Sequence, residues 1–308
     1  MSDTLENLRR KIDGAGELAS VVHTMKAVAA SGVSQYENAV AALTDYHRTV
    51  ELGLSVCFRQ DESVSVERRN HMYPGEIGAV VFGSDQGLVG QFNDLMADFV
   101  STTLGALPGN KIVWAVGERV QSSLADAGLP ATGLFALPNS VAAITPLVGA
   151  ILTLVDAQLT IGKIGSLYIF HHRPKLGAVY EPVSQRLLPL DEKWRRGNAD
   201  LPWPTGNLPE IIGEIEPALL REYLFITLFQ ACAESLASEN ASRLAAMQRA
   251  EKNIADLLDD LNRSLHRLRQ GSIDDELFDV ISGFEALNYV SKKTTGAPLE
   301  APVVDCHR

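Results

Sequence analysis

The distribution of proline divides this chain of 308 residues into three parts. Of its 14 prolines, 12 lie between Pro74 and Pro217, whereas residues 1–73 contain none and none lies between Pro217 and Pro298. Proline inside a helix costs about 3 kcal/mol, because it removes a hydrogen bond and its ring clashes with the preceding turn. The two ends of the chain can therefore form long helices, while the middle must fold differently.

Apolar side chains at both ends recur at steps of three or four residues, which is the pattern of an amphipathic helix. In the C-terminal part the pattern continues over 210–288, and such length without a stop signal is typical of a coiled coil. Because a compact segment separates the two helices, they can pair only antiparallel. The residues we expect in the buried seam include Leu18, Val22, Leu257 and Leu261.

Between these helices, strand and helix patterns alternate. Such alternation predicts a mostly parallel sheet covered by helices, with a hairpin formed by the last two strands. The fold class is therefore α/β: a long antiparallel coiled coil of the N- and C-terminal helices plus a central Rossmann-like α/β domain with a mostly parallel sheet. Strands are expected at 77–82, 111–116, 164–171 and 179–188, and helices at 92–107, 118–127 and 141–159. The expected divisions are 1–73, 74–209, 210–288 and a flexible tail over 289–308.

A glycine-rich turn, Gly83–Gly90, follows the first expected strand. A phosphate-binding P-loop would need a Gly-Lys-Ser/Thr ending, and this turn contains no lysine. Its G-x-x-x-G-x-x-G spacing also differs from the G-x-G-x-x-G of dinucleotide-binding folds. We therefore expect a structural turn and no cofactor. His171 and His172 are expected to end a strand, one on each face, and not to bind a metal.

Composition excludes several classes of protein. A net charge of −11 argues against non-specific binding of nucleic acid, since neutralising the phosphates needs clustered cations. We expect no membrane-spanning segment and no secretory signal. Three widely spaced cysteines form neither a disulfide framework nor a metal-binding spacing. No arrangement of nucleophile, base or paired carboxylates suggests an active site, so we expect the chain not to be an enzyme.

Three sets of residues, in the same order along the chain, resemble the signatures of the F-type ATP synthase gamma subunit family. Near the N-terminus these are Leu8-Arg-Arg-Lys-Ile12 and Met25-Lys-Ala-Val-Ala-Ala30. In the middle the likeness lies in Ser84-Asp-Gln-Gly-Leu-Val-Gly90 with Asn93. At the C-terminal end it lies in Ser238–Met247, Arg269–Glu276 and Ile281–Ala286.

This resemblance implies a central rotor shaft that couples ion flow through a membrane ring to ATP synthesis or hydrolysis on a ring of alpha and beta subunits. One copy per complex would contact alpha, beta, the epsilon subunit and the membrane rotor ring of c subunits, with no nucleic acid involved. The implied location is peripheral, on the cytoplasmic face of the bacterial inner membrane. The carried ion would be hydrogen or sodium.

The resemblance also assigns roles to individual residues. Met25, Lys26, Arg243, Arg269 and Gln270 match family positions at the contact between rotor and stator. The residues that match the central-domain loop of the family are Ser84, Asp85, Gly87, Gly90 and Asn93.

Some features depart from the usual family pattern. Between residues 12 and 47 there is one lysine, Lys26, and no arginine. Asp274 stands where the family usually has threonine, and the chain continues past Leu287 to Arg308. These departures resemble a divergent branch, such as the alternate sodium-translocating ATPases. Two other functions compete with the shaft: a non-motor coiled-coil scaffold, and a small α/β enzyme with a coiled-coil oligomerisation arm.

Overall fold

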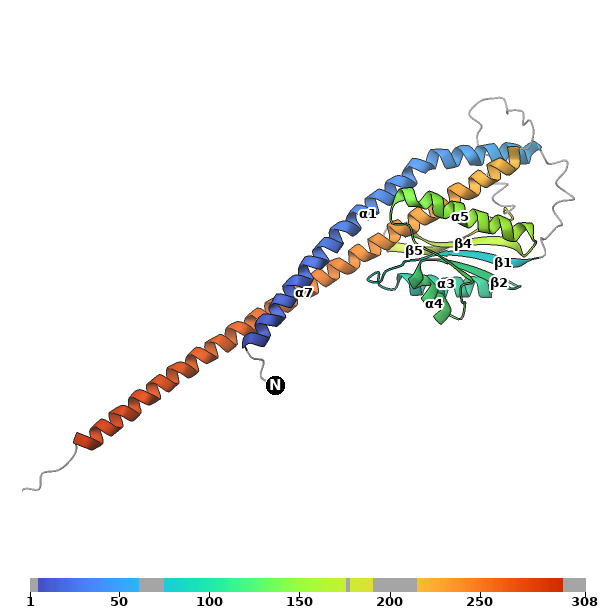
Figure 1. Ribbon diagram of the computed structural model, residues 1–308. Coiled ribbons are helices and arrows are strands. Elements are labelled where there is room, and N and C mark those ends of the chain that lie inside the picture. Colours follow the sequence, from blue (N-terminus) through green and yellow to red (C-terminus); the bar gives the residue numbers. More distant parts are fainter. Residues whose placement is uncertain (1–4, 61–74, 176–177, 191–214, 296–308) are drawn as a thin grey trace, which may run out of the picture. The chain divides into compact units, whose positions relative to one another are not determined.

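The computed structural model describes residues 5–60, 75–175, 178–190 and 215–295 (Figure 1). Its contacts group the chain into two compact units, each described by itself below. The smaller unit contains the residues up to Val21 and those from Glu251 onward, and the larger unit is Val22–Ala250. Both divisions fall inside long helices, whereas the sequence-based divisions were placed at helix ends.

A five-stranded sheet forms the centre of the larger unit. The strand order is β3-β2-β1-β4-β5, and all neighbours are parallel except the antiparallel hairpin β4–β5. This confirms the predicted mostly parallel sheet and its terminal hairpin. The strands are β1 (Glu76–Phe82), β2 (Lys111–Val116), β3 (Gly133–Phe135), β4 (Ile164–Lys175) and β5 (Ala178–Leu188). Strand β3 was not expected from the sequence, because three residues are too few to show a period of two.

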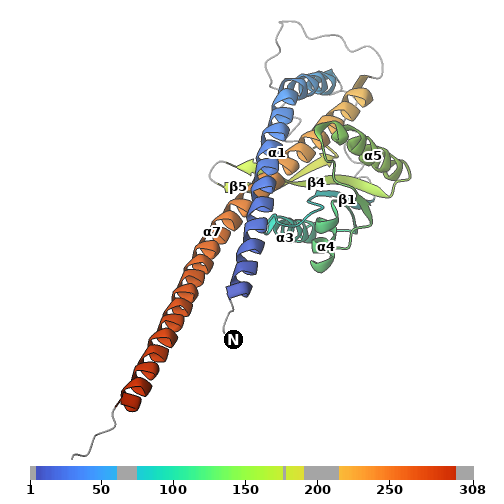
Figure 2. The ribbon, with the colours of Figure 1, turned by 60° about the vertical axis from the view of Figure 1, so that its left-hand side comes forward.

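Helices cover both faces of this sheet (Figures 1 and 2). On one face, α3 (Phe92–Gly105) and α4 (Glu118–Asp126) pack against side chains such as Val81 and Phe170. On the opposite face, α5 (Val141–Thr160) shares a second core with α1 (Leu5–Gln60) and α7 (Ile215–Thr295). Alternate residues of β1 divide between the two cores, as the two-residue period of a strand requires.

Helix α5 is long and apolar enough to cross a membrane by length and composition alone, with a mean hydropathy of 1.7. The sequence-based expectation of no membrane-spanning segment did not take this helix into account. However, its buried side chains lie in the core beneath the sheet, among them Ile144, Val148 and Ile151. The apolar composition of α5 is therefore used, along one side, to cover the sheet.

The long helices α1 and α7 run antiparallel within the larger unit. The Tyr46 hydroxyl donates to Oε1 of Glu222 at 2.9 Å, and the rings of His47 and Tyr223 lie 5.7 Å apart. Farther back along α1, Gly32 packs against Asn240, where an added Cβ would lie 2.7 Å from Oδ1. Earlier residues of α1 thus meet later residues of α7, which confirms the predicted antiparallel pairing.

The buried seam of α1 follows a strict heptad rather than the looser spacing read from the sequence. Its most buried side chains are seven residues apart, and half-buried ones follow four residues later at Ile12, Ala19 and Lys26. Val22 lies on the seam, but Leu18 is exposed, because Ala19 takes the second seam position. The first row is Leu8, Ala15, Val22, Ala29 and Tyr36.

In α7 the prediction was also half correct. Leu261 is half-buried, whereas Leu257 is exposed and Leu258 takes the inward position. The helix continues through Gly271 and Gly283 to Thr295, so residues 289–295, predicted as part of a flexible tail, are helical. Residues 296–308 lie outside the described part of the chain.

The heptad predicts opposite outcomes for two neighbouring residues. Ala29 is fully buried and Val28 is 66% exposed. Ala29→Asp should lower the free energy of unfolding by roughly 3–5 kcal/mol, because it buries an unpaired carboxylate between the helices. Val28→Asp, the matched control, should change it by about 0.5 kcal/mol or less. Urea denaturation followed by circular dichroism measures both, and equal effects would mean that the seam is assigned incorrectly.

Candidate functional site

The glycine-rich turn after β1 is held by side-chain hydrogen bonds to its own backbone. The buried Ser84 donates its backbone N–H to Oδ1 of Asn93 at 3.0 Å, and Nδ2 of Asn93 donates to the Ser84 hydroxyl at 2.8 Å. That hydroxyl in turn donates to the carbonyl of Gln86 at 2.9 Å. Ser84 and Asn93 therefore use their polar groups to fix the turn against the start of α3.

Asp85 ties the same turn to α4 and to the loop after β3. Its Oδ1 accepts from the backbone N–H of Glu118 at 2.9 Å, and its Oδ2 accepts from that of Leu137 at 3.2 Å. A carboxylate at a helix N-terminus satisfies an unpaired donor and complements the helix dipole. The structure thus brings Ser84, Asp85 and Asn93 together, and the hydrogen bonds of all three hold the turn in place.

The glycines of the turn have different roles. At Gly83, an added Cβ would lie 2.2 Å from Cβ of Val120, so only glycine fits beneath α4. Gly90 has a φ of +61°, a left-handed conformation that glycine adopts without strain. Gly87, by contrast, has an ordinary φ, and an added Cβ there would meet only the end of Arg119, at 3.8 Å.

Helix α7 packs directly against this turn. The Ser242 hydroxyl donates to the carbonyl of Val89 at 2.6 Å, and the guanidinium of Arg249 lies 4.0 Å from the position of a Cβ on Gly90. The turn follows β1, and the chain continues from β1 to β2 on one side of it and later returns to β4 on the other side. In open α/β sheets, ligands bind at the carboxyl ends of the strands where the strand order reverses in this way. Here the chain's own helix lies against that point.

Arg243 is committed to a partner within the chain. Its guanidinium lies 2.6 Å from Oε1 of Glu239, and both side chains are largely buried. Burial raises the pKa of Glu239, the nearby Arg243 lowers it, and the charge of Asp85 raises it further. The net effect is a raised pKa. Arg243 therefore compensates a buried carboxyl group beside the turn and does not project freely to solvent.

The other residues matched to the rotor–stator contact lie on the two long helices. Met25 and Lys26 are half-buried on α1 within the larger unit. Arg269 and Gln270 are exposed on α7 within the smaller unit. Exposure leaves the guanidinium and amide of this second pair available to a partner chain.

An apolar stripe lies near the same part of α7. Its six large side chains are between 45% and 70% exposed, although they lie within 210–288, where the sequence pattern predicts a coiled coil. Contiguous exposed apolar side chains mark interaction surfaces. The stripe consists of Ile273, Leu277, Phe278, Val280, Ile281 and Phe284.

The adjacent histidines point to opposite faces of β4, as predicted, but they do not end the strand, which continues to Lys175. Nε2 of His171 lies 2.9 Å from Oε2 of Glu234 on α7. Nε2–H of His172 donates to the carbonyl of Phe92 at 2.8 Å on the other face. Sequence reasoning did not find Glu234, because nothing in the spacing shows which helix covers which strand.

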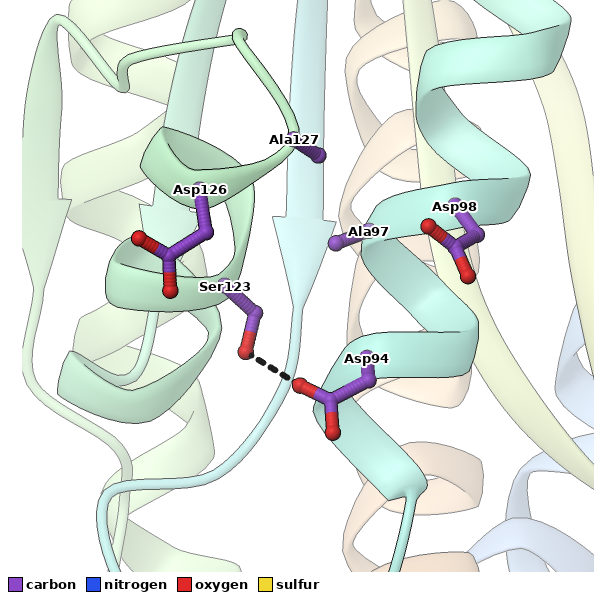
Figure 3. Close-up of a pocket in the computed structure, with 6 residues that line it drawn as sticks. All are labelled: Asp94, Ala97, Asp98, Ser123, Asp126 and Ala127. Atoms are coloured by element: carbon purple, nitrogen blue, oxygen red, sulfur yellow. Dashed lines mark hydrogen bonds between the residues drawn. The ribbon is translucent and has the colours of Figure 1, made fainter.

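A shallow groove of about 210 Å³ separates α3 from α4 (Figure 3). Three carboxylates line it, and Oδ1 of Asp94 accepts a hydrogen bond from the Ser123 hydroxyl at 2.9 Å. Asp98 and Asp126 lie on the two helices on either side (Figure 3). Within the described ranges, no group of three or more His, Cys, Asp or Glu side chains is arranged to hold a metal ion.

Comparison with known proteins gives a consistent picture. A family model described as ATP synthase matches residues 4–287. The ATP synthase gamma chain of Dechloromonas aromatica is 28% identical over 292 residues, covering 92% of this chain and 99% of that protein. The gamma chain of Haemophilus influenzae is 25% identical over 296 residues, with the same coverage.

Solved structures share the fold. A chain in the OSCP/F1/c-ring structure of the mitochondrial ATP synthase of Euglena gracilis has a TM-score of 0.66 at 15% identity, covering 97% of this chain and 99% of that chain. A chain in the rotor structure of the same enzyme has a TM-score of 0.60 at 15% identity, covering 87% and 98%. At such identities the likeness concerns the arrangement of the backbone alone.

The packing of the turn predicts a large cost for one added methyl group. Gly83→Ala should lower the free energy of unfolding by about 3 kcal/mol or more, because the new Cβ overlaps Val120. Gly149→Ala is the control, since no neighbouring atom lies within 4 Å of a Cβ there and alanine favours the helix by up to about 1 kcal/mol. Thermal and urea unfolding of both variants would reveal the difference; a stable Gly83→Ala protein would contradict the described turn.

The buried His172 predicts a loss of stability in acid. Burial lowers its pKa from 6.5 to about 4, so the folded state binds its proton less readily than the unfolded state. The stability it contributes is complete above pH 6.5 and is lost as the pH falls toward 4, by about 2 kcal/mol between pH 7 and pH 5. Urea denaturation should show a weaker pH dependence for His172→Gln than for the wild type or the exposed control His266→Gln. If His172→Gln showed the same pH dependence as the wild type, the role given to His172 would be wrong.

Proposed function

The chain belongs to the ATP synthase gamma-chain family, and we propose that it works as the central rotor shaft coupling ion flow through a membrane ring to ATP synthesis or hydrolysis. As a family member it is a non-catalytic subunit, and the chemistry takes place on its partners. The observation that carries the proposal is the antiparallel pairing of α1 with α7, combined with an α/β sheet whose usual ligand position α7 covers.

The same observation weighs against one of the two competing functions. A small α/β enzyme needs an open crevice at the carboxyl ends of its strands, and here Ser242 and Arg249 of α7 lie there. A passive scaffold is compatible with the paired helices, but it requires neither turnover nor rotation. The distinction between scaffold and shaft therefore depends on measurements made on the assembled complex.

We assign the partners from the family. One copy of the chain would contact the alpha and beta subunits through its long helices, and the epsilon subunit and the ring of c subunits through its α/β part. The apolar stripe near the end of α7, from Ile273 to Phe284, has the character of a surface that turns inside a partner ring. Apolar contacts suit this role because they are non-directional and so do not favour one angle.

Arg269 and Gln270 are proposed as the directional contacts to that ring. Arginine offers a fork of donors that suits a carboxylate, and glutamine adds a donor and an acceptor beside it. Met25 and Lys26 are proposed as a second contact region on α1. We assign Arg243 a different primary role, since its guanidinium compensates the buried Glu239.

The chain is part of a membrane-associated complex. We propose a peripheral position on the cytoplasmic face of the bacterial inner membrane, in keeping with the bacterial gamma chains that it resembles along nearly its whole length. The choice between hydrogen and sodium ions would belong to the membrane ring and not to this chain.

The test is co-expression with the alpha and beta subunits encoded in the same genome. We expect a complex that contains one copy of this chain and hydrolyses ATP much faster than alpha and beta alone. Equal turnover with and without the chain would favour the scaffold. ATP hydrolysis by the isolated chain would refute the non-catalytic role.

A double variant tests the directional contacts. Arg269→Ala with Gln270→Ala should leave the free subunit stable, because exposed side chains contribute little to folding. ATP turnover of the assembled complex should fall by about tenfold or more, since each lost charge-assisted bond removes roughly 1.5–3 kcal/mol. Arg267→Ala, an exposed arginine on the same turn, is the control. Full turnover in the assembled double variant would rule out this contact.

A further inference from the structure

One segment of α7 is covered on every side. Residues 231–239 are buried without interruption over nine positions, which is two and a half turns of helix. A helix buried all round is normally apolar all round, because polar groups lose their hydration there. This segment nevertheless contains two carboxylic acids, Glu234 and Glu239, and two serines, Ser235 and Ser238.

The neighbours on two sides of the segment are known from contacts. Tyr36 of α1 belongs to the same buried core as Ala231, Cys232 and Leu236, and burial, with the nearby Glu239, raises the pKa of its hydroxyl. On the other side, β4 supplies His171. The segment is therefore the place within the larger unit where α1, α7 and the sheet are joined.

Glu234 makes hydrogen bonds through both carboxylate oxygens. Oε2 lies 2.9 Å from Nε2 of His171 on β4, and Oε1 accepts from Nε2 of Gln230, one turn earlier on α7, at 2.8 Å. Burial raises the pKa of Glu234, but the hydrogen bonds from His171 and Gln230, with the charges of His171 and Arg173, outweigh it and lower the pKa below its usual value. The carboxylate is therefore ionised, and Nε2–H of His171 is the donor.

A directional pair restricts motion that the surrounding apolar contacts permit. Leu224 and Leu228 lie one helical turn apart on α7 in the core shared with the sheet, so a slip of one turn would bring one leucine to the place of the other. The same slip would move Glu234 by 5.4 Å and leave a carboxylate without its donor in a buried place. The hydrogen bond to His171 distinguishes one register of α7 on β4 from its neighbours.

We propose that His171 and Glu234 are a positioning pair, which locks the sheet to α7 in a single register so that load applied to the α/β part is transmitted to the helices without slip. This inference rests on the proposed function, because only a shaft carries such a load. Both side chains are largely buried between β4 and α7, so the pair acts through the attachment of α7. A second contact, from Ser242 to the carbonyl of Val89, holds the next turns of α7 against the loop after β1.

The test measures torsional stiffness in the assembled complex. The alpha–beta ring is fixed to a surface, and a bead is attached to the α/β part at Ile161→Cys, which is 69% exposed at the end of α5. Cys57 and Cys232 are buried, and Cys306 is replaced by serine to leave one reactive thiol. The width of the bead's angular fluctuation in a stalled complex gives the stiffness.

The variants separate positioning from packing. Glu234→Leu keeps the volume but removes the directional bond, and its stiffness should fall by about half or more. Glu234→Gln retains an acceptor for His171 and should restore most of it. Glu181→Gln, which removes the carboxylate that pairs with Lys175 on the hairpin, is the control and should match the wild type.

Each outcome has one meaning. A pair with only a packing role would lower the melting temperature of Glu234→Leu but leave the stiffness of assembled complexes unchanged, and that result overturns the proposal. If Glu234→Leu does not assemble, His171→Gln serves in its place, and wild-type stiffness there also overturns it. A wild-type complex in which the bead does not turn when ATP is added would instead refute the proposed function.

Discussion

The structure depends on the burial of residues 231–239 of α7 between α1 and the sheet. The two helices come from opposite ends of the chain, and the sheet comes from its middle. The contacts of this segment therefore join parts of the chain that are far apart in the sequence. Burial on all sides also explains its small side chains, which let neighbours approach, and the pairing of its two carboxyl groups, which lose their hydration there. Glu234 pairs with His171, and Glu239 pairs with Arg243.

The polar groups of the glycine-rich turn are likewise engaged within the chain. Its geometry resembles that of phosphate-binding loops in being short, rich in glycine and placed between a strand and a helix. Yet the polar groups of Ser84, Asp85 and Asn93 form hydrogen bonds within the turn and to the neighbouring backbone. In addition, Ser242 of α7 donates a hydrogen bond to the turn. An α/β sheet that binds ligands in other proteins serves here as an attachment for two long helices. In the proposed function, the contacts to the alpha and beta subunits lie on those helices.

Much of this could be read from the sequence, and the exceptions have physical causes. Proline placement and apolar periodicity predicted both long helices, four strands and the hairpin, since each follows from local pattern. The seam was assigned only in part, because leucines at 18 and 257 lie one position away from the true heptad rows and pattern alone does not fix the phase. The pairing of His171 with Glu234 could not be predicted from the sequence, because it depends on how α7 crosses the sheet. The roles given to Arg269 and Gln270 concern partner chains, and they remain predictions.

The most direct test of the shaft is to watch the chain turn. A fluorescent or bead label at Ile161→Cys, in a complex held by its alpha and beta subunits, reports the angle of the α/β part while ATP is hydrolysed. The account predicts continuous rotation in one direction that stops when ATP is removed. A complex that hydrolyses ATP at full rate while the label stays at one angle would show that the chain is a static scaffold, and would contradict the account.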